Sequence, residues 1–164
     1  SFGDKLPPVF QRCIEENIKI KIFQQCVVSQ NDMLKEKFNS LNIDFKLFNF
    51  SNNILEYFSK VDLVITRSGA SIIAELVNCN IPFISIPFPH AADNHQEKNA
   101  VYFKNKGFGF LIYERDIALN LLPLIKSIYK DKKILKDISD KQNIYSDKKV
   151  FKKIDNEIQK LIND

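Results

Sequence analysis

Residues 62–100 contain two consecutive units in which an apolar strand runs into a polar turn and then into a helix. The first strand, 62–66, is followed by the turn Ser68-Gly69-Ala70, and the second, 83–86, by a longer polar loop. These spacings are too long for hairpins, so we expect the strands to pair in parallel with right-handed crossovers. Two polar turns at the carboxyl ends of neighbouring parallel strands form the kind of crevice in which open α/β sheets bind ligands.

The same alternation continues along the chain and predicts one domain over residues 1–164. Its fold class is α/β, a Rossmann-like parallel sheet flanked by helices. The run 62–66 is almost entirely apolar, which is typical of a strand buried on both faces. The predicted helices cover 4–17, 31–40, 53–60, 71–78, 94–105, 114–129 and 131–162, and the predicted strands lie within 18–28 and at 43–50, 62–66, 83–86 and 107–112.

Composition argues against several other classes of protein. The chain is 45% hydrophobic and 27% charged, as globular domains are, and no apolar run approaches the roughly 20 residues of a membrane span. Acidic residues are interleaved with the lysines and the net charge is only +4, so we expect no nucleic-acid partner. Cys13, Cys26 and Cys79 have neither CxxC nor zinc-site spacing, which predicts buried, reduced thiols in a cytoplasmic protein.

The turn Ser68-Gly69-Ala70-Ser71 is a candidate anion site. A phosphate at a helix N-terminus needs free backbone N–H groups, a favourable dipole and no bulky side chain in the way, and these small residues meet all three needs. An ordinary strand–helix turn, with Ser68 or Ser71 as the N-cap, explains the same residues equally well. Both interpretations stay open at this point.

Two further candidate positions lie close to that turn in the sequence, and a third ends another predicted strand. Glu75 is four residues after Ser71, so its carboxylate lies on the same helical face, where it either accepts both hydroxyls of a ribose or is simply solvated. Arg67 pairs either with a diphosphate or, as we slightly prefer, with an acidic side chain inside the domain. Ser51 ends another predicted strand and offers backbone groups to a flat base at the same edge of the sheet.

The loop before and into the helix at 94–105 carries His95, Gln96 and Asn99 on one helical face. Amides both donate and accept hydrogen bonds, which suits sugar hydroxyls. The spacing Asp93-x-x-Gln96 also matches a capping box, which competes for Gln96. A metal site of His90, Asp93 and His95 and a Ser71–His95–Asp93 triad are weaker alternatives, because nothing fixes the first geometry and no GxSxG motif supports the second. We therefore expect no metal site and no metal cofactor.

The two motifs, at 62–76 and 87–100, together resemble the C-terminal half of the MurG family. These are bacterial transferases that move N-acetylglucosamine from UDP onto lipid-linked muramyl-pentapeptide. The resemblance extends more weakly, in the order of helices and strands, over essentially the whole chain. It implies a GT-B fold in which this half binds the donor, UDP-N-acetylglucosamine.

The resemblance also assigns roles to individual residues. It implies that Glu75 holds the ribose hydroxyls and that main chain near Ser51 reads the uracil. The resemblance implies an inverting displacement in the intact protein, with the departing UDP stabilised by the helix dipole and Arg67, and no catalytic residue in this half. It also implies that backbone of Ser71 and Ile72, after the turn of Ser68, Gly69 and Ala70, receives the diphosphate, and that His95 and Gln96 face the sugar with Asn99 in support.

Three departures from the family pattern qualify these expectations. The family has a Gly-Gly-Ser-Gln-Gly-type loop just before the position where this chain begins, and it often carries Gln in place of His95. On this resemblance we expect the acceptor-binding N-terminal half, with its base and membrane-docking surface, to lie outside these 164 residues. We therefore expect the chain alone to be inactive, and the intact hexosyltransferase to lie in the cytoplasm on the inner face of the plasma membrane. Alternatives are a soluble nucleotide-sugar-binding subunit of a split glycosyltransferase and a non-enzymatic nucleotide-binding Rossmann module.

Overall fold

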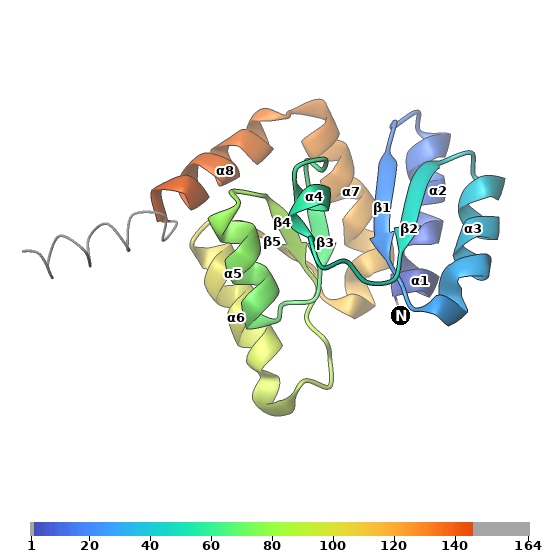
Figure 1. Cartoon of the computed structure of the whole chain (residues 1–164). Helices are drawn as coiled ribbons and strands as arrows, with labels where there is room; N and C mark the ends of the chain where they lie inside the picture. The colour runs from blue at the N-terminus through green and yellow to red at the C-terminus, as the bar shows by residue number, and fades with distance from the viewer. Residues whose placement is uncertain (1, 146–164) are drawn as a thin grey trace, which may run out of the picture.

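The computed structural model describes residues 2–145 and alternates strands with helices along the chain (Figure 1). The strands are β1 (Lys21–Gln25), β2 (Asp44–Phe48), β3 (Val64–Thr66), β4 (Phe83–Ser85) and β5 (Gly109–Leu111). The helices are α1 (Phe2–Lys5), α2 (Pro7–Glu15), α3 (Asn31–Ser40), α4 (Leu55–Phe58), α5 (Ala70–Asn78), α6 (His95–Asn105), α7 (Ile117–Lys130) and α8 (Lys133–Tyr145). Short 3₁₀ turns, Val28–Gln30, Ala92–Asn94 and Glu114–Asp116, precede α3, α6 and α7.

All strand pairs in the described residues are parallel, which confirms the α/β class with helices flanking parallel strands. Hydrogen bonding nevertheless divides the strands into two sheets, β1–β2 and β3–β4–β5, where a single sheet was expected. The prediction that 62–66 is buried on both faces was wrong. β3 is an edge strand with its residues half-buried, whereas β4 lies between two neighbours and is fully buried.

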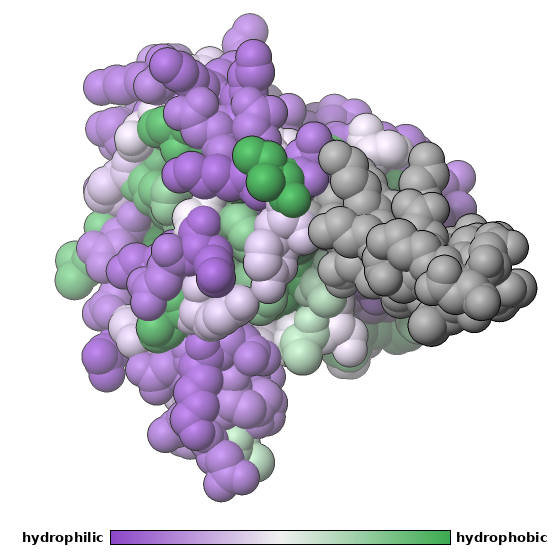
Figure 2. Space-filling model, turned by 90° about the vertical axis from the view of Figure 1, so that its left-hand side faces the viewer, coloured by the Kyte–Doolittle hydropathy of each residue, from purple (hydrophilic) through white to green (hydrophobic). Residues whose placement is uncertain are grey.

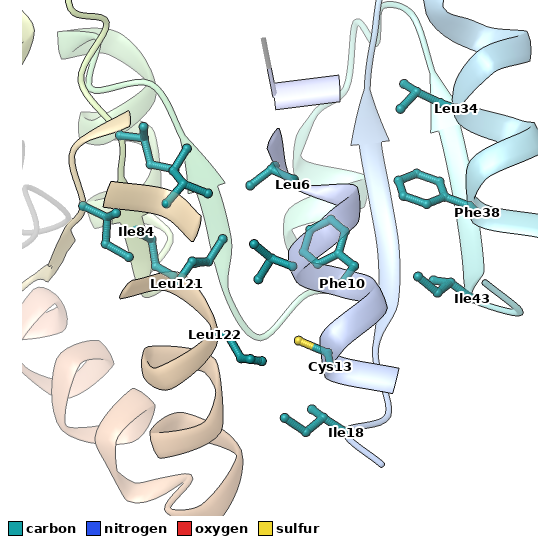
Figure 3. Packing of buried hydrophobic residues seen from close by; sticks show 14 of the residues in the cluster. Leu6, Phe10, Cys13, Ile18, Leu34, Phe38, Ile43, Ile84, Leu121 and Leu122 are labelled. Carbon is teal, nitrogen blue, oxygen red and sulfur yellow. The ribbon is translucent and has the colours of Figure 1, made fainter. Parts of the chain in front are cut away.

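One apolar core packs across both sheets. Its buried side chains come from α2, α3, α7 and β4, and half-buried residues of β1, β2 and β3 pack against them. Figure 3 shows Phe10 and Cys13 of α2 between β1 and the α7 side chains Leu121 and Leu122. A second cluster lies beneath α5 and includes Ile73, Leu76 and Phe83. The shared core explains how two separately hydrogen-bonded sheets form one body.

Prolines account for one difference at the N-terminus. The helix expected over 4–17 is divided at Leu6 into α1 and α2. Pro7 and Pro8 have no backbone N–H, so the helical bonds that would cross this point cannot form. Pro at the first positions of α2 costs nothing there, because those N–H groups would have no helical acceptor.

The C-terminal helices follow the prediction closely within the described residues. The helix expected over 114–129 begins as a 3₁₀ turn and continues as α7, with Pro123 inside it. The helix expected over 131–162 is seen as α8, and the part of the prediction beyond Tyr145 lies outside the described residues. α8 is held by buried Gln142, whose amide donates to the carbonyls of Ile81 (3.0 Å) and Phe108 (2.7 Å).

The cysteines are free thiols, as expected. Cys13 and Cys26 are buried, and burial raises the pKa of Cys13 to about 11. Cys79 is only half-buried, so its predicted burial was wrong; it lies at the C-cap of α5, where the helix leaves the core. Within residues 2–145 no helix combines the length and the apolar character that crossing a membrane requires.

Candidate functional site

Figure 1 shows the loops that follow β2, β3 and β4 emerging together at the lower side of the molecule. The loop after β3 leads into α5 and the loop after β4 into α6. Figure 2 shows that the lower end, where α6 begins, is largely hydrophilic. A separate hollow of about 170 Å³, lined by residues of α2 and the end of α3, shares no residue with these loops. We therefore place the candidate site at the polar edge formed by the loops after β2, β3 and β4, and not in that hollow.

The start of α5 leaves its first backbone N–H groups open. Gly69 is the N-cap, with φ −64° and ψ 145°, and no side chain caps the helix. The N–H groups of Ala70, Ser71 and Ile72 form the first turn and have no carbonyl within the helix to bond. A Cβ at Gly69 would meet only the Ile72 side chain, at 3.8 Å, so the approach is unobstructed. The alternative in which Ser68 or Ser71 caps this helix was wrong.

Ser68 itself lies beneath the turn. Its side chain is fully buried, and its hydroxyl has no hydrogen-bond partner within residues 2–145. Its carbonyl, by contrast, accepts a hydrogen bond of 3.1 Å from the side-chain amide of Asn99 in α6. This bond joins the turn after β3 to the helix after β4.

Glu75 lies one turn further along α5 and is exposed. Because Ser71 is four residues earlier, the two side chains share a helical face, with the glutamate leaning back toward the open N-terminus. Ile72 is half-buried and packs against the cluster beneath the helix. The exposed carboxylate of Glu75 is therefore positioned to accept hydrogen bonds from a ligand bound at the start of α5.

Gln96 is the second link across the site. Its side-chain oxygen accepts a hydrogen bond of 3.0 Å from the backbone N–H of Phe88, in the loop after β4. The Asp93-x-x-Gln96 capping box is therefore wrong: Asn94 is the N-cap of α6 in a left-handed conformation, without a side-chain cap. Asp93 is also left-handed (φ 49°), so the chain turns too sharply for the reciprocal bonds of a capping box.

His95 begins α6 and is exposed, and its Nδ1 lies 2.7 Å from the carbonyl oxygen of Ala92. A carbonyl only accepts, so Nδ1 donates in this contact, and in the neutral imidazole Nε2 is then the acceptor nitrogen. Among the described residues, no three His, Cys, Asp or Glu side chains are grouped so as to hold a metal ion. His90, Asp93 and His95 are therefore not brought together as a ligand set.

Arg67 is held inside the domain. Its Nη2 lies 2.6 Å from Oε2 of Glu114, and its Nη1 donates to the carbonyls of Ile86 (3.3 Å) and Pro87 (3.2 Å). The rings of Phe2 and Phe88 lie 4.5 and 5.3 Å from the guanidinium carbon. These contacts favour the pairing with an internal acidic side chain that the sequence allowed. A contact between Arg67 and a diphosphate remains a prediction.

Ser51 lies in the loop after β2, half-buried, on the other sheet. Its hydroxyl accepts a hydrogen bond of 3.1 Å from the backbone N–H of Asn53, which makes a local turn. The neighbouring Phe50 is 77% exposed, so an aromatic face stands free beside the predicted base site. The loop that contains Ser51 thus lies on the same lower side of the molecule as the loops after β3 and β4, and the hydrogen bond of Ser51 is made within its own loop.

Sequence reasoning missed the residues that follow β5. Tyr113 donates a hydrogen bond of 2.8 Å to Glu97 of α6, and this bond, aided by burial, raises the pKa of Tyr113. Glu114 pairs with both Arg67 and Lys5. The available signal was their position: a polar pair directly after the predicted strand 107–112, at the same carboxyl edge as the other loops.

The arrangement matches known proteins. Residues 8–158 match the family model for the glycosyltransferase family 28 C-terminal domain. The curated transferases named UDP-N-acetylglucosamine--N-acetylmuramyl-(pentapeptide) pyrophosphoryl-undecaprenol N-acetylglucosamine transferase include relatives from Pelagibacter ubique and Rickettsia felis. The first is 34% identical over 134 residues, covering 77% of this chain and 38% of the relative. The second is 35% identical over 141 residues, covering 84% and 39%.

A solved structure agrees on the fold. The crystal structure of Acinetobacter baumannii MurG superposes with a TM-score of 0.79 at 20% identity, over 97% of this chain and 46% of that one. The chain thus spans less than half the length of the proteins that it matches. By family model, sequence and fold, the chain belongs to the glycosyltransferase family 28 C-terminal domain family and corresponds to the C-terminal half of a MurG-type GT-B transferase.

Proposed function

We propose that this chain is the donor-binding domain of a peptidoglycan-precursor transferase, which binds UDP-N-acetylglucosamine for inverting transfer to lipid I, forming lipid II. The activity for which the curated relatives are named supports the choice of substrates. The observation that carries the proposal is the open N-terminus of α5, tied through Asn99 and the Ser68 carbonyl to the polar start of α6. Such an arrangement offers an anion site and a hydroxyl site side by side.

The diphosphate belongs at the start of α5 in this proposal. The backbone N–H groups of Ser71 and Ile72 point out of the helix end, and the dipole adds partial positive charge there. Gly69 keeps side-chain bulk away from the approaching oxygens. The turn also holds the unpartnered hydroxyl of Ser68 directly beneath it. The negative charge is met by the helix end, so the proposal includes no metal ion.

The nucleoside extends from that point toward the other sheet. Glu75 accepts the two ribose hydroxyls from its place one turn along α5. Main-chain groups near Ser51 bind the uracil edge, and the exposed ring of Phe50 stands beside them. These two assignments predict selectivity for a uridine nucleotide over an adenosine nucleotide, because purine and pyrimidine edges place donors and acceptors differently.

The sugar lies over the start of α6. Gln96 uses its oxygen for the Phe88 N–H, so its two amide protons remain to donate to sugar hydroxyls. His95 presents Nε2 as an acceptor, since its Nδ1 is bonded to the Ala92 carbonyl. Asn99 supports both by holding α6 to the turn after β3.

The reaction itself needs the half that this chain does not contain. A hydroxyl of the lipid-linked acceptor, deprotonated by a base in that half, attacks the anomeric carbon from the face opposite UDP. The bond to UDP breaks with inversion, and the charge on the departing diphosphate is stabilised at the start of α5. The acceptor carries a lipid, so the intact protein works in the cytoplasm, peripheral to the inner face of the plasma membrane.

Calorimetric titration of the chain with UDP-N-acetylglucosamine, UDP and ADP tests the proposal. Without the other half of the cleft we expect a Kd on the order of 10⁻⁴ M, about 5–6 kcal/mol, for the two uridine ligands. Glu75→Ala should abolish measurable binding. Its matched control is Glu36→Ala, an exposed glutamate of α3 on the other sheet, which should bind as the wild type does.

Two results would contradict the proposal. Equal affinity for ADP and UDP would contradict a site selective for uridine. Unchanged affinity in Glu75→Ala would contradict the assignment of Glu75 to the ribose hydroxyls. A longer protein that includes the preceding half should bind more tightly and transfer sugar to a lipid-linked acceptor.

A further inference from the structure

Glu114 lies at the junction of three segments that meet at the site. It follows β5, its side chain is only 14% exposed, and its two oxygens are shared between two cations. Oε1 lies 2.9 Å from Nζ of Lys5 in α1, and Oε2 lies 2.6 Å from Nη2 of Arg67 after β3. The hydrogen bond from Lys5 and the charge of Arg67 lower the pKa of Glu114, although its burial acts in the opposite direction.

Arg67 carries this restraint onward to the loop after β4. Its second nitrogen, Nη1, donates to the carbonyls of Ile86 and Pro87. The next residue, Phe88, donates its backbone N–H to Gln96 and lies beside the guanidinium. A continuous series of contacts therefore runs from the carboxylate of Glu114 to the side chain that is assigned to the sugar.

Tyr113, the residue before Glu114, makes a parallel contact. Its hydroxyl donates to Glu97, the neighbour of Gln96 at the start of α6. The segment after β5 thus restrains the sugar-facing end of α6 in two ways, directly through Glu97 and indirectly through Arg67. Neither contact touches the start of α5, where the diphosphate is assigned.

We propose that Glu114 is a positioning residue for sugar recognition, which holds Arg67 against the loop after β4 and so fixes Gln96 over the start of α6. The inference rests on the proposed donor site. Without the carboxylate, Arg67 keeps neutral partners, the carbonyls of Ile86 and Pro87 and the rings of Phe2 and Phe88, and an arginine so placed turns toward the nearest anion. In the donor complex that anion is the diphosphate.

Loss of the Glu114 carboxylate should therefore affect the binding of UDP-N-acetylglucosamine more than the binding of UDP. Loss of Glu114 loosens the loop after β4 and weakens contacts to the sugar, while freed Arg67 adds charge near the diphosphate. The first effect lowers the affinity for UDP-N-acetylglucosamine relative to UDP, because only that ligand carries the sugar, whereas the second acts on the diphosphate that both ligands carry. A general loss of structure would instead weaken both ligands alike, so the ratio of the two dissociation constants separates positioning from a merely structural role.

The experiment measures that ratio by calorimetry in the wild type and in Glu114→Ala, Glu114→Gln and Lys5→Gln. We expect Glu114→Ala to shift the ratio against the sugar nucleotide by about five- to tenfold, the size of one typical hydrogen bond lost at the sugar. Glu114→Gln still accepts from Arg67 and should recover part of the shift. Lys5→Gln, which leaves the Arg67 pair in place, should keep the wild-type ratio.

A second measurement does not depend on the ligand. Backbone amide exchange by NMR should be faster at Phe88 in Glu114→Ala, whereas the amide of Ile84, buried in β4, should keep its protection. An unchanged ratio together with unchanged exchange at Phe88 overturns the positioning role while donor binding stands. Absence of uridine-nucleotide binding in the wild type overturns the proposed function, and the positioning role with it.

Discussion

The side-chain amide of Asn99 donates a hydrogen bond of 3.1 Å to the main-chain carbonyl of Ser68. The two residues belong to different strand–helix units, and Asn99 lies in the second turn of α6. Through this bond the open N-terminus of α5 and the start of α6, to which we assign the sugar, keep one relative position. The proposed donor site is therefore a single unit built from two loops.

Replacement of Asn99 by Asp tests that bond. An aspartate has no proton to donate at neutral pH, so its carboxylate would face the Ser68 carbonyl with both oxygens negative. We expect a loss of about 1–2 kcal/mol in the free energy of unfolding and a several-fold weaker Kd for UDP-N-acetylglucosamine, measured by urea denaturation and calorimetry. Asn39→Asp, at the exposed end of α3, is the control. Wild-type affinity in Asn99→Asp would show that the bond does not shape the site.

Replacement by alanine should have different effects on stability at Gly109 and at Gly69. A Cβ at Gly109 would lie 2.5 Å from the carbonyl oxygen of Phe83 and 2.7 Å from its ring, because β5 closely approaches β4. Gly109→Ala should therefore lower the free energy of unfolding by about 1–3 kcal/mol or more through overpacking. Gly69→Ala makes an ordinary van der Waals contact with Ile72, at 3.8 Å and an ordinary φ, and should cost at most about 1 kcal/mol as a poorer N-cap.

The same pair separates folding from binding. Gly69→Ala places a methyl group at the approach to the helix N-terminus, so UDP binding should weaken although the fold is kept. Thermal unfolding and calorimetry of both variants check this expectation. If Gly69→Ala binds UDP as tightly as the wild type, the assignment of the diphosphate to the start of α5 is wrong.

Stability at low pH should depend on Glu114. Its folded-state pKa is lowered, first by the hydrogen bond from Lys5. In the acidic range the unfolded chain therefore binds more protons at this group than the folded chain. The stabilisation is complete above the unfolded pKa, about 4.3, and is lost as the pH falls through the folded pKa.

Urea denaturation at a series of pH values from 6 to below 4 measures this contribution. The free energy of unfolding should fall more steeply in the wild type than in Glu114→Gln, which has no carboxylate to protonate. Asp44→Asn, which removes the exposed partner of Lys21, should keep the wild-type slope. Parallel curves for the wild type and Glu114→Gln would mean that the pair contributes nothing to acid stability.

Gln142 should be essential for docking α8. Gln142→Leu keeps a similar volume but leaves the buried carbonyls of Ile81 and Phe108 without this donor. At about 1–3 kcal/mol for each of the two unsatisfied carbonyls, we expect a loss of about 2–6 kcal/mol in the free energy of unfolding. Lys136→Ala, exposed on the same helix, should change it by less than about 0.5 kcal/mol. A loss below about 1 kcal/mol in Gln142→Leu would contradict the docking role.

The helices and strands and their order along the chain follow from the amino-acid sequence alone. Helical spacing located α3 at Asn31–Ser40, and the two strand–turn–helix units of 62–100 appear as β3–α5 and β4–α6. The resemblance of those units to the MurG family is confirmed by the family model and by relatives of known activity. Such features are local: they depend on residues within a turn or a strand, whose periodicity is written in the chain.

Tertiary structure alone decided the partners. The sequence could not show that Gly69 caps α5, that Gln96 bonds Phe88, or that Arg67 pairs with Glu114. It also could not show that β4 is central and β3 an edge strand, since strand order depends on contacts between distant segments. A side chain with several acceptors in reach takes the one that the packed sheets and loops bring to it, and that choice is made only when the core closes.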